Sequence, residues 1–238
     1  MWFADRSEAG RILAERLRAF ANRGDVIVLA LPRGGVVVGY EVARVLRAPL
    51  DVLVVRKLGV PGHPELAMGA IASGGARVLS PDVIGMLGIS QASIEAVAVR
   101  EQAELERRER AYRGERPAAA VRGRAVLIVD DGLATGATMR AAVQSLRAQG
   151  PARIVVAVPV GAPETCAEMR SEADEVVCAR SPEPFEAVGA WYEDFAQTSD
   201  DEVRDLLARA AHELGGLRKD DVRAGGRALT FRGSSAEE

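Results

Sequence analysis

Short runs of consecutive apolar residues alternate with amphipathic stretches along most of the chain. Uninterrupted apolar runs of this length are typical of buried strands in a parallel sheet. They predict strands at 26–31, 50–55, 126–129, 154–158 and 175–178. Apolar residues at helical spacing predict helices at about 5–22, 36–47, 90–112, 137–149 and 199–212, with shorter ones that begin at Ser80-Pro81 and cover 163–170. Strands that alternate with helices indicate an α/β fold with a mostly parallel sheet covered by helices on both faces.

The same pattern predicts one domain over residues 1–213. Within it, 56–66 reads as a loop because glycine and proline punctuate it, and 67–72 pairs with 77–79 as a hairpin. Residues 179–198 are rich in proline and then in aromatic residues, without a regular period, which suggests a small cap over the edge of the sheet. Residues 214–238 carry little apolar content and are expected to form a disordered tail.

Composition narrows the class of protein. A hydrophobic fraction of 48% and a charged fraction of 27% are those of a globular chain, and a net charge of −3 implies no broad surface for nucleic acid. No apolar run approaches the ~18 residues that span a bilayer, and Cys166 and Cys178 are too few for a disulfide framework. We therefore expect a cytoplasmic protein with no membrane or nucleic-acid partner. The charges over 100–110 alternate in sign, which favours a solvated or oligomer-facing helix over an RNA-binding arm.

Residues 126–138 carry the strongest chemical signal. Asp130 and Asp131 follow the apolar strand directly, and a small-residue turn with Thr135 and Thr138 leads into the next helix. Backbone N–H groups, hydroxyls and the positive end of a helix suit a phosphate monoester. Carboxylates would repel that phosphate unless they bind something else, such as a sugar diol or a metal. A phosphorylated ribose satisfies both halves of this motif.

Two further loops are expected at the same sheet edge. Pro32-Arg33-Gly34-Gly35 ends the first strand, where glycines admit close backbone approach and an arginine can contact phosphate oxygens. Arg56-Lys57 ends the next strand. Lys57 is conspicuous because the chain uses arginine for every other basic residue except Lys219 in the tail.

Residues 126–138 resemble the phosphoribosyl pyrophosphate (PRPP) signature of type I phosphoribosyltransferases. The resemblance implies that the acidic pair binds the ribose 2′ and 3′ hydroxyls and that 134–138 holds the 5′-phosphate. It also implies that the loop 32–35, often with a non-proline cis peptide, binds pyrophosphate, and that a mobile loop after Arg56-Lys57 closes over PRPP. The spacing Arg-Lys-x-Gly-x-Pro-Gly, with Ala134, is closer to adenine phosphoribosyltransferases. Gly132 departs from the signature, which usually has a branched apolar residue there.

This resemblance implies transfer of 5-phosphoribosyl from PRPP to a nitrogen nucleophile, with a nucleobase as the expected acceptor and pyrophosphate as the leaving group. It further implies Mg²⁺ bound through substrate oxygens, with no protein metal ligands, and a homodimer as one assembly. Two alternatives stay open: a non-catalytic PRPP- or nucleotide-binding regulator, and a phosphoribosyl hydrolase. The residues expected to be catalytic are Asp130, Asp131, Lys57 and Arg33, and those expected to bind substrate are Pro32, Gly34, Gly35, Arg56, Ala134, Thr135, Gly136, Ala137 and Thr138.

Overall fold

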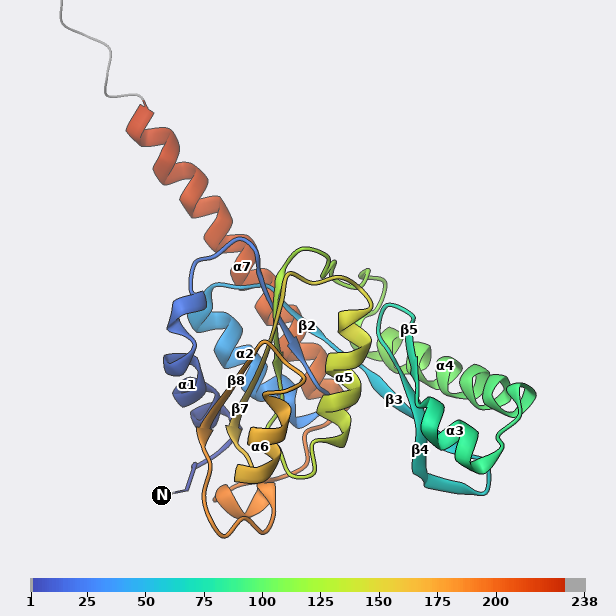
Figure 1. Ribbon diagram of the computed structural model, residues 1–238. Coiled ribbons are helices and arrows are strands. Elements are labelled where there is room, and N and C mark those ends of the chain that lie inside the picture. The colour runs from blue at the N-terminus through green and yellow to red at the C-terminus, as the bar shows by residue number, and fades with distance from the viewer. Residues whose placement is uncertain (1, 230–238) are drawn as a thin grey trace, which may run out of the picture.

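The core of the molecule is a five-stranded, wholly parallel sheet with strand order β2-β1-β6-β7-β8 (Figure 1). The computed structural model describes residues 2–229, with side chains over 2–63 and 66–215. The strands are β1 (Val26–Ala30), β2 (Leu50–Val52), β6 (Ala125–Val129), β7 (Arg153–Val160) and β8 (Glu175–Arg180). β1 and β6 are buried along their whole length, as the uninterrupted apolar runs predicted.

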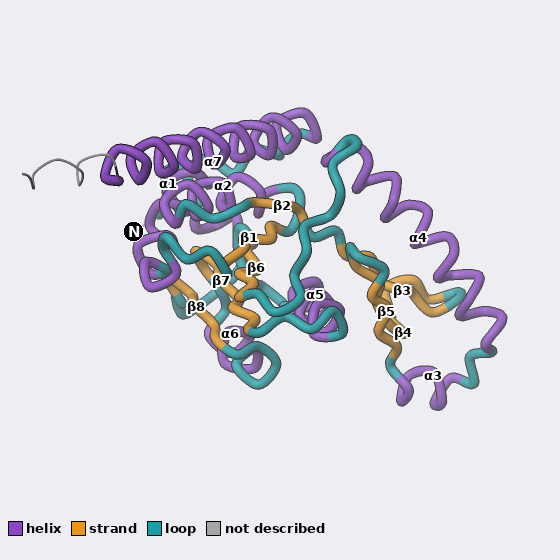
Figure 2. Tube along the Cα trace, turned by 90° about the horizontal axis from the view of Figure 1, so that it is seen from above, coloured by secondary structure: helices purple, strands orange, loops and turns teal. Residues whose placement is uncertain are grey.

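Helices cover both faces of this sheet, so the predicted α/β class is confirmed. Helices α1 (Arg6–Arg16) and α2 (Gly34–Leu46) lie on one face, and α5 (Ala137–Arg147) and α6 (Pro163–Met169) lie on the other (Figure 2). Helix α7 (Asp200–Leu229) packs on the outside of α2. A disulfide between Cys166 and Cys178 joins α6 to β8.

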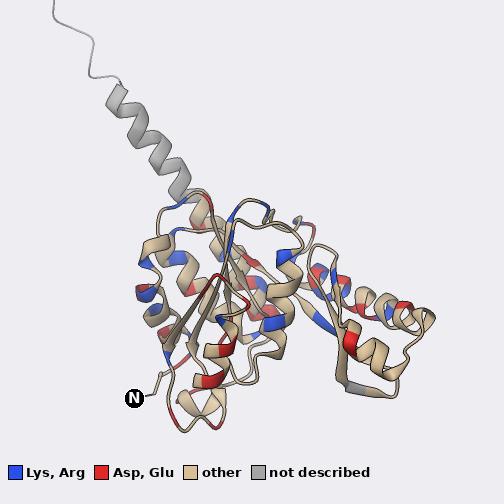
Figure 3. Cartoon of the chain, viewed as in Figure 1, with Lys and Arg blue, Asp and Glu red and all other residues tan. Residues whose placement is uncertain are grey.

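Residues 55–113 form a separate lobe beside the sheet, which we call the arm (Figure 1). It contains an antiparallel sheet of β3 (Val55–Val60), β4 (His63–Ala72) and β5 (Ala76–Leu79), followed by α3 (Pro81–Leu87) and α4 (Gln91–Arg113). Leu58 and Met68 are fully buried and pack in the same cluster as Ile94 and Val97 of α4. The predicted hairpin between β4 and β5 is confirmed. Charges of both signs alternate along α4 (Figure 3).

The arm corrects two predictions. Residues 50–55 are not one strand, because the chain leaves the core sheet after Val52 and the amide of Val54 donates to Oγ of Ser73 at 2.9 Å. Residues 56–66 are not a loop either. They form most of a β-hairpin whose turn contains Gly62 at φ +82°. The glycines and prolines mark that turn and a register irregularity at Gly59, rather than an absence of strand structure.

The chain ends also differ from prediction. Helix α7 begins at the predicted cap, where the amide of Glu202 donates to Oγ of Ser199 at 3.1 Å. It then continues to Leu229 instead of ending near His212. Residues 214–229 are therefore helical rather than a disordered tail, because extension of a packed helix costs far less than nucleation. Residues 230–238 lie outside the described part of the chain.

The predicted cap corresponds to residues 181–198, which we call the hood. It follows β8, contains one 3-10 turn at Val188–Trp191, and is otherwise irregular. Phe3 forms an isolated β-bridge with Tyr192, and both side chains are buried. Among the described residues, no helix is long and apolar enough to cross a membrane.

Candidate functional site

The candidate site lies where β1 and β6 end side by side. The two strands pair in parallel up to Ala30 and Val129, and the amide of Leu31 donates to the carbonyl of Val129 at 2.9 Å. The chain connects β1 to β2 on one side and reaches β6 on the other, which makes this edge the switch point of the sheet. Open α/β sheets bind ligands at such a point. The predicted loops after β1 and β6 therefore share one edge.

The loop after β1 packs directly on the acidic pair. The Pro32–Arg33 peptide is cis, as the resemblance implied. A β-carbon on Gly34 would overlap the carboxylate of Asp131, and one on Gly35 would lie 2.9 Å from the Cα of Asp130. These two glycines form the first turn of α2, so the helix begins two residues earlier than predicted. Only glycine permits this approach, which places helix N–H groups beside two carboxylates.

The acidic pair is held in an unequal way. The backbone amide of Asp131 donates to Oδ1 of Asp130 at 2.8 Å, whereas Nε of Arg6 donates to Oδ2 of Asp131 at 2.8 Å. Burial raises the pKa of the Asp130 carboxyl well above its ordinary value, and the charge of Asp131 raises it further, while Arg6 lowers it. Each carboxylate keeps one oxygen that no N–H group of the described residues holds. Two such oxygens suit the two hydroxyls of a diol.

The turn after the acidic pair is anchored from α6 and α5. Oγ1 of Thr165 donates to the carbonyl of Ala134 at 2.6 Å, and Arg140 donates to the carbonyl of Thr135 at 2.5 Å. Gly136 has φ +71° and begins α5, whose first residue is Ala137. The side chains of Thr135 and Thr138 are exposed and make no hydrogen bond with any described residue. Hydroxyls and helix N–H groups are thus left available for an anion.

Gly132 is explained by the hood. A β-carbon at this position would overlap the methyl groups of Val188 in the 3-10 turn of the hood. The branched side chain usual at this point of the signature is thus absent, and a valine from 56 residues further along the chain fills the space. The turn keeps its apolar contact, supplied from another segment.

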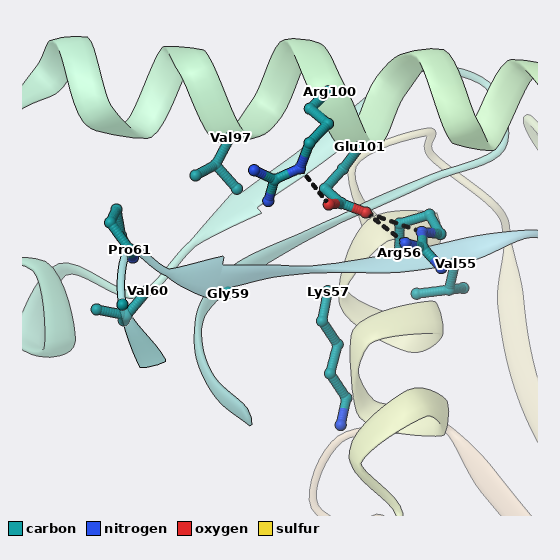
Figure 4. Close-up of a pocket in the computed structure, with 10 residues that line it drawn as sticks. Val55, Arg56, Lys57, Gly59, Val60, Pro61, Val97, Arg100 and Glu101 are labelled. Atoms are coloured by element: carbon teal, nitrogen blue, oxygen red, sulfur yellow. Dashed lines mark hydrogen bonds and ion pairs between the residues drawn. The ribbon is translucent and has the colours of Figure 1, made fainter. Parts of the chain in front are cut away.

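Arg56 and Lys57 lie on opposite faces of β3 (Figure 4). Arg56 faces α4 and pairs with Glu101 at 2.6 Å, whereas Lys57 points away from that pair. The Lys57 side chain forms no ion pair with any residue that the structure describes, and it lines a cavity of about 530 Å³ with Ala137 and Arg140 of α5. A second cavity of about 660 Å³, between β3 and α4, is also lined by Arg56 and Lys57. The structure therefore brings Lys57, but not Arg56, towards the helix that begins at the phosphate turn.

Arg33 turns towards the start of α7. Its guanidinium lies 3.9 Å from a carboxylate oxygen of Asp200, and the hydroxyl of Tyr112 donates to the same oxygen at 3.0 Å. The pair is exposed, so it contributes little stability. An anion in the loop 32–35 could compete for this arginine at low cost.

Arg6, the ion-pair partner of Asp131, belongs to the site although the sequence did not mark it, and Tyr192 of the hood lies beside the same aspartate. Tyr192 donates from its hydroxyl to the carbonyl of Asp131 at 2.5 Å, and burial raises the pKa of that hydroxyl. The Arg6 guanidinium lies 3.8 Å above the ring centre of Phe195. Arg6 follows a helix cap, where a charged residue is ordinarily solvent-exposed, so no local signal distinguished it. The ring of Tyr192 is buried in the hood.

The side chains at this edge of the sheet limit how a metal ion can bind there. Among the side chains that the structure describes, over 2–63 and 66–215, no group of three or more His, Cys, Asp or Glu could hold a metal ion. The acidic pair supplies two carboxylates at the end of β6. Mg²⁺ keeps several waters and prefers phosphate oxygens, so the oxygens present fit a cation that arrives with a phosphorylated substrate.

The fold and the site together define a protein of the phosphoribosyltransferase class, and comparison with known proteins agrees. The family model described as "Phosphoribosyl transferase domain" matches residues 6–193, and the chain belongs to this family.

Two Mycobacterium tuberculosis proteins named "Putative phosphoribosyl transferase", from strains CDC 1551 and H37Rv, are each 51% identical over 212 residues, or 89% of this chain. The chain spans about half the length of these relatives, 48% of each. The crystal structure of TT1426 from Thermus thermophilus is 47% identical with a TM-score of 0.78, and the match covers 87% of this chain and 98% of that one.

Proposed function

We propose that this chain transfers 5-phosphoribosyl from PRPP to a nitrogen nucleophile, with a nucleobase as the acceptor class. The observation that carries the proposal is the contact between the two loops at the switch point. Gly34 and Gly35 touch Asp131 and Asp130 so closely that a β-carbon would not fit. A pyrophosphate on the loop 32–35 and a ribose on the acidic pair would therefore be adjacent, as they are in PRPP.

In the proposed reaction, the bond from the ribose anomeric carbon to pyrophosphate breaks and a bond to the acceptor nitrogen forms. The pyrophosphate leaves with the electron pair of the broken bond, and the acceptor N–H proton is released. Negative charge grows on pyrophosphate, where Arg33, Lys57 and the α2 amides would stabilise it. Positive charge grows on the ribose, close to the acidic pair. Mg²⁺, carried by the PRPP oxygens, would further neutralise the leaving group.

Lys57 is placed to reach the pyrophosphate when the arm closes over the substrate. Its strand belongs to the arm, and its ammonium has no ion-pair partner among the described residues. An unpaired ammonium loses no protein contact when it moves to a phosphate. Closure of the arm would also exclude water, which would otherwise hydrolyse the reactive ribosyl centre.

The test is pyrophosphate release from Mg-PRPP across a panel of purine and pyrimidine bases, with Asp131→Asn as the matched variant. Release that requires one base and is lost in Asp131→Asn supports the transferase and identifies the acceptor. Base-independent release indicates a hydrolase. Tight PRPP binding without release under any condition indicates a regulator. Full activity of Asp131→Asn would overturn the assignment of the acidic pair.

A further inference from the structure

The N-terminal residues tie the hood to the rest of the molecule. The amide of Phe3 donates to the carbonyl of Trp191 at 2.9 Å, and the amide of Glu193 donates back to the carbonyl of Phe3 at 2.8 Å. The amide of Asp194 donates to the carbonyl of Ala4 at 3.0 Å. Phe3 and Ala4 are thus hydrogen-bonded to the hood, with Phe3 in an isolated β-bridge to Tyr192. Helix α1 begins directly after this N-terminal segment.

Arg6, in the first turn of α1, connects this N-terminal segment to the acidic pair. Its Nε atom lies 2.8 Å from Oδ2 of Asp131, and its Nη1 atom donates to the carbonyl of Ala196 in the hood at 2.7 Å. The guanidinium stacks on Phe195, and 11% of the side chain is exposed. A planar guanidinium can hold two acceptors and one aromatic face at once, which a lysine cannot do.

Three segments meet at one carboxylate oxygen. A β-carbon on Gly34 would overlap Oδ2 of Asp131 and would lie 2.7 Å from Nε of Arg6. The loop after β1, the acidic pair after β6 and helix α1 are therefore in mutual contact. A shift of Arg6 would release Asp131 on the side that faces the pyrophosphate loop.

We propose that Arg6 is a positioning residue of the ribose site. It orients Asp131 through Oδ2, leaves Oδ1 for a ribose hydroxyl, and ties that geometry to the hood. This inference rests on the proposed function, because it takes the acidic pair as the ribose ligand. It gives the hood a role in PRPP binding that is separate from contact with the acceptor.

The charges around the pair make the proposal testable by pH. The titratable groups that face it are Asp130, Asp131, Arg6 and the hydroxyl of Tyr192. Burial raises the pKa of Tyr192, so that group stays neutral below about pH 10. Arg6 lowers the pKa of Asp130. Loss of the Arg6 charge is therefore expected to move the acidic limit of PRPP binding to higher pH, because a protonated carboxyl is a poorer acceptor of hydrogen bonds from the ribose hydroxyls.

The experiment measures Mg-PRPP binding by calorimetry from pH 5 to pH 8 in the wild type, Arg6→Gln, Arg6→Lys and Arg11→Gln. Arg11, half-exposed on the same helix, is the matched control. We expect Arg6→Gln to raise Kd about 10-fold at pH 7 and to shift the acidic midpoint upwards. Arg6→Lys should keep the midpoint near the wild-type value with a smaller rise in Kd. Arg11→Gln should behave as the wild type.

An unchanged Kd and midpoint in Arg6→Gln would overturn the inference. If Arg6→Gln does not fold, Phe195→Leu takes its place: loss of the ring under the guanidinium should raise Kd about threefold, and an unchanged Kd would overturn the proposal. A wild type that does not bind Mg-PRPP overturns the proposed function instead. The role of Arg6 is then decided by carbon-13 NMR titration of the aspartate carboxyls, where Arg6→Gln must raise the pKa of Asp130.

Discussion

The side chain of Val188 occupies the space that a β-carbon on Gly132 would require. Gly132 follows the acidic pair, whereas Val188 lies in the hood. The hood is therefore packed against the turn that carries the two carboxylates. This contact accounts for the departure of the chain from the usual signature. It also means that substitutions at Gly132 and Val188 are expected to have coupled effects on stability.

Gly132→Val should destabilise the protein by about 1–3 kcal/mol, the usual cost of overpacking a filled site. Val188→Ala alone should also destabilise it, because it leaves a cavity. The double variant should lose less than the sum of the two single losses, since each change makes room for the other. Urea denaturation of all four proteins measures this coupling. Strictly additive losses would show that the hood does not rest on Gly132 in solution.

The central sheet and the chemical motif were predictable because both are local in sequence. An unbroken apolar run such as 126–129 predicts a buried strand, and the acidic pair follows it directly. The cis peptide at Pro32–Arg33 came from the resemblance alone. These features need no knowledge of what lies opposite them in space.

The arm and the hood contacts were not predictable in the same way. Glycine and proline near Gly59 and Gly62 lowered the strand signal, and only burial of Leu58 against α4 shows why the segment is a strand. The ion pair of Arg6 with Asp131 joins residues 125 positions apart. No periodicity or motif encodes such a pairing, so a single sequence gives no indication of it.

Gly34→Ala should abolish PRPP binding while most of the fold survives. The new methyl group would fall on the Asp131 carboxylate and displace either that side chain or the start of α2. Gly24→Ala is the matched control, because a β-carbon there meets nothing within 4 Å. Circular dichroism and PRPP binding of both variants provide the check. If Gly34→Ala bound PRPP as well as Gly24→Ala, the close contact of the two loops would not be needed.

Arg56→Ala and Lys57→Ala should fail in different ways. Lys57→Ala removes an ammonium without a described partner, so stability should hold while pyrophosphate release falls roughly 10²-fold. Arg56→Ala leaves Glu101 with one of its two arginine partners, so it should destabilise the protein by about 1–3 kcal/mol. Release rates and denaturation curves of both variants separate the two roles. A rate loss confined to Arg56→Ala would show that the catalytic cation is Arg56 and not Lys57.

Asp130→Asn should raise thermal stability and remove activity. Burial, followed by the charge of Asp131, raises the pKa of Asp130 in the folded protein. The folded state therefore binds this proton more tightly than the unfolded state does. The contribution of this group to stability falls as the pH rises from about 4, the ordinary pKa of an aspartate carboxyl, through its raised pKa in the folded protein. At neutral pH the ionised carboxylate therefore destabilises the folded state.

The amide that Asp130→Asn introduces would carry no charge, and its oxygen could still accept the hydrogen bond from the amide of Asp131 that Oδ1 accepts now. We expect Tm at pH 7.5 to rise by about 2–4 °C, which corresponds to about 1 kcal/mol in a domain of this size. The gain should shrink as the pH approaches 4, where both proteins are neutral at this position. Scanning calorimetry of the two proteins at pH 4.5, 6 and 7.5 measures the trend. A lower Tm for Asp130→Asn at pH 7.5 would show that the protein already compensates the buried charge of Asp130.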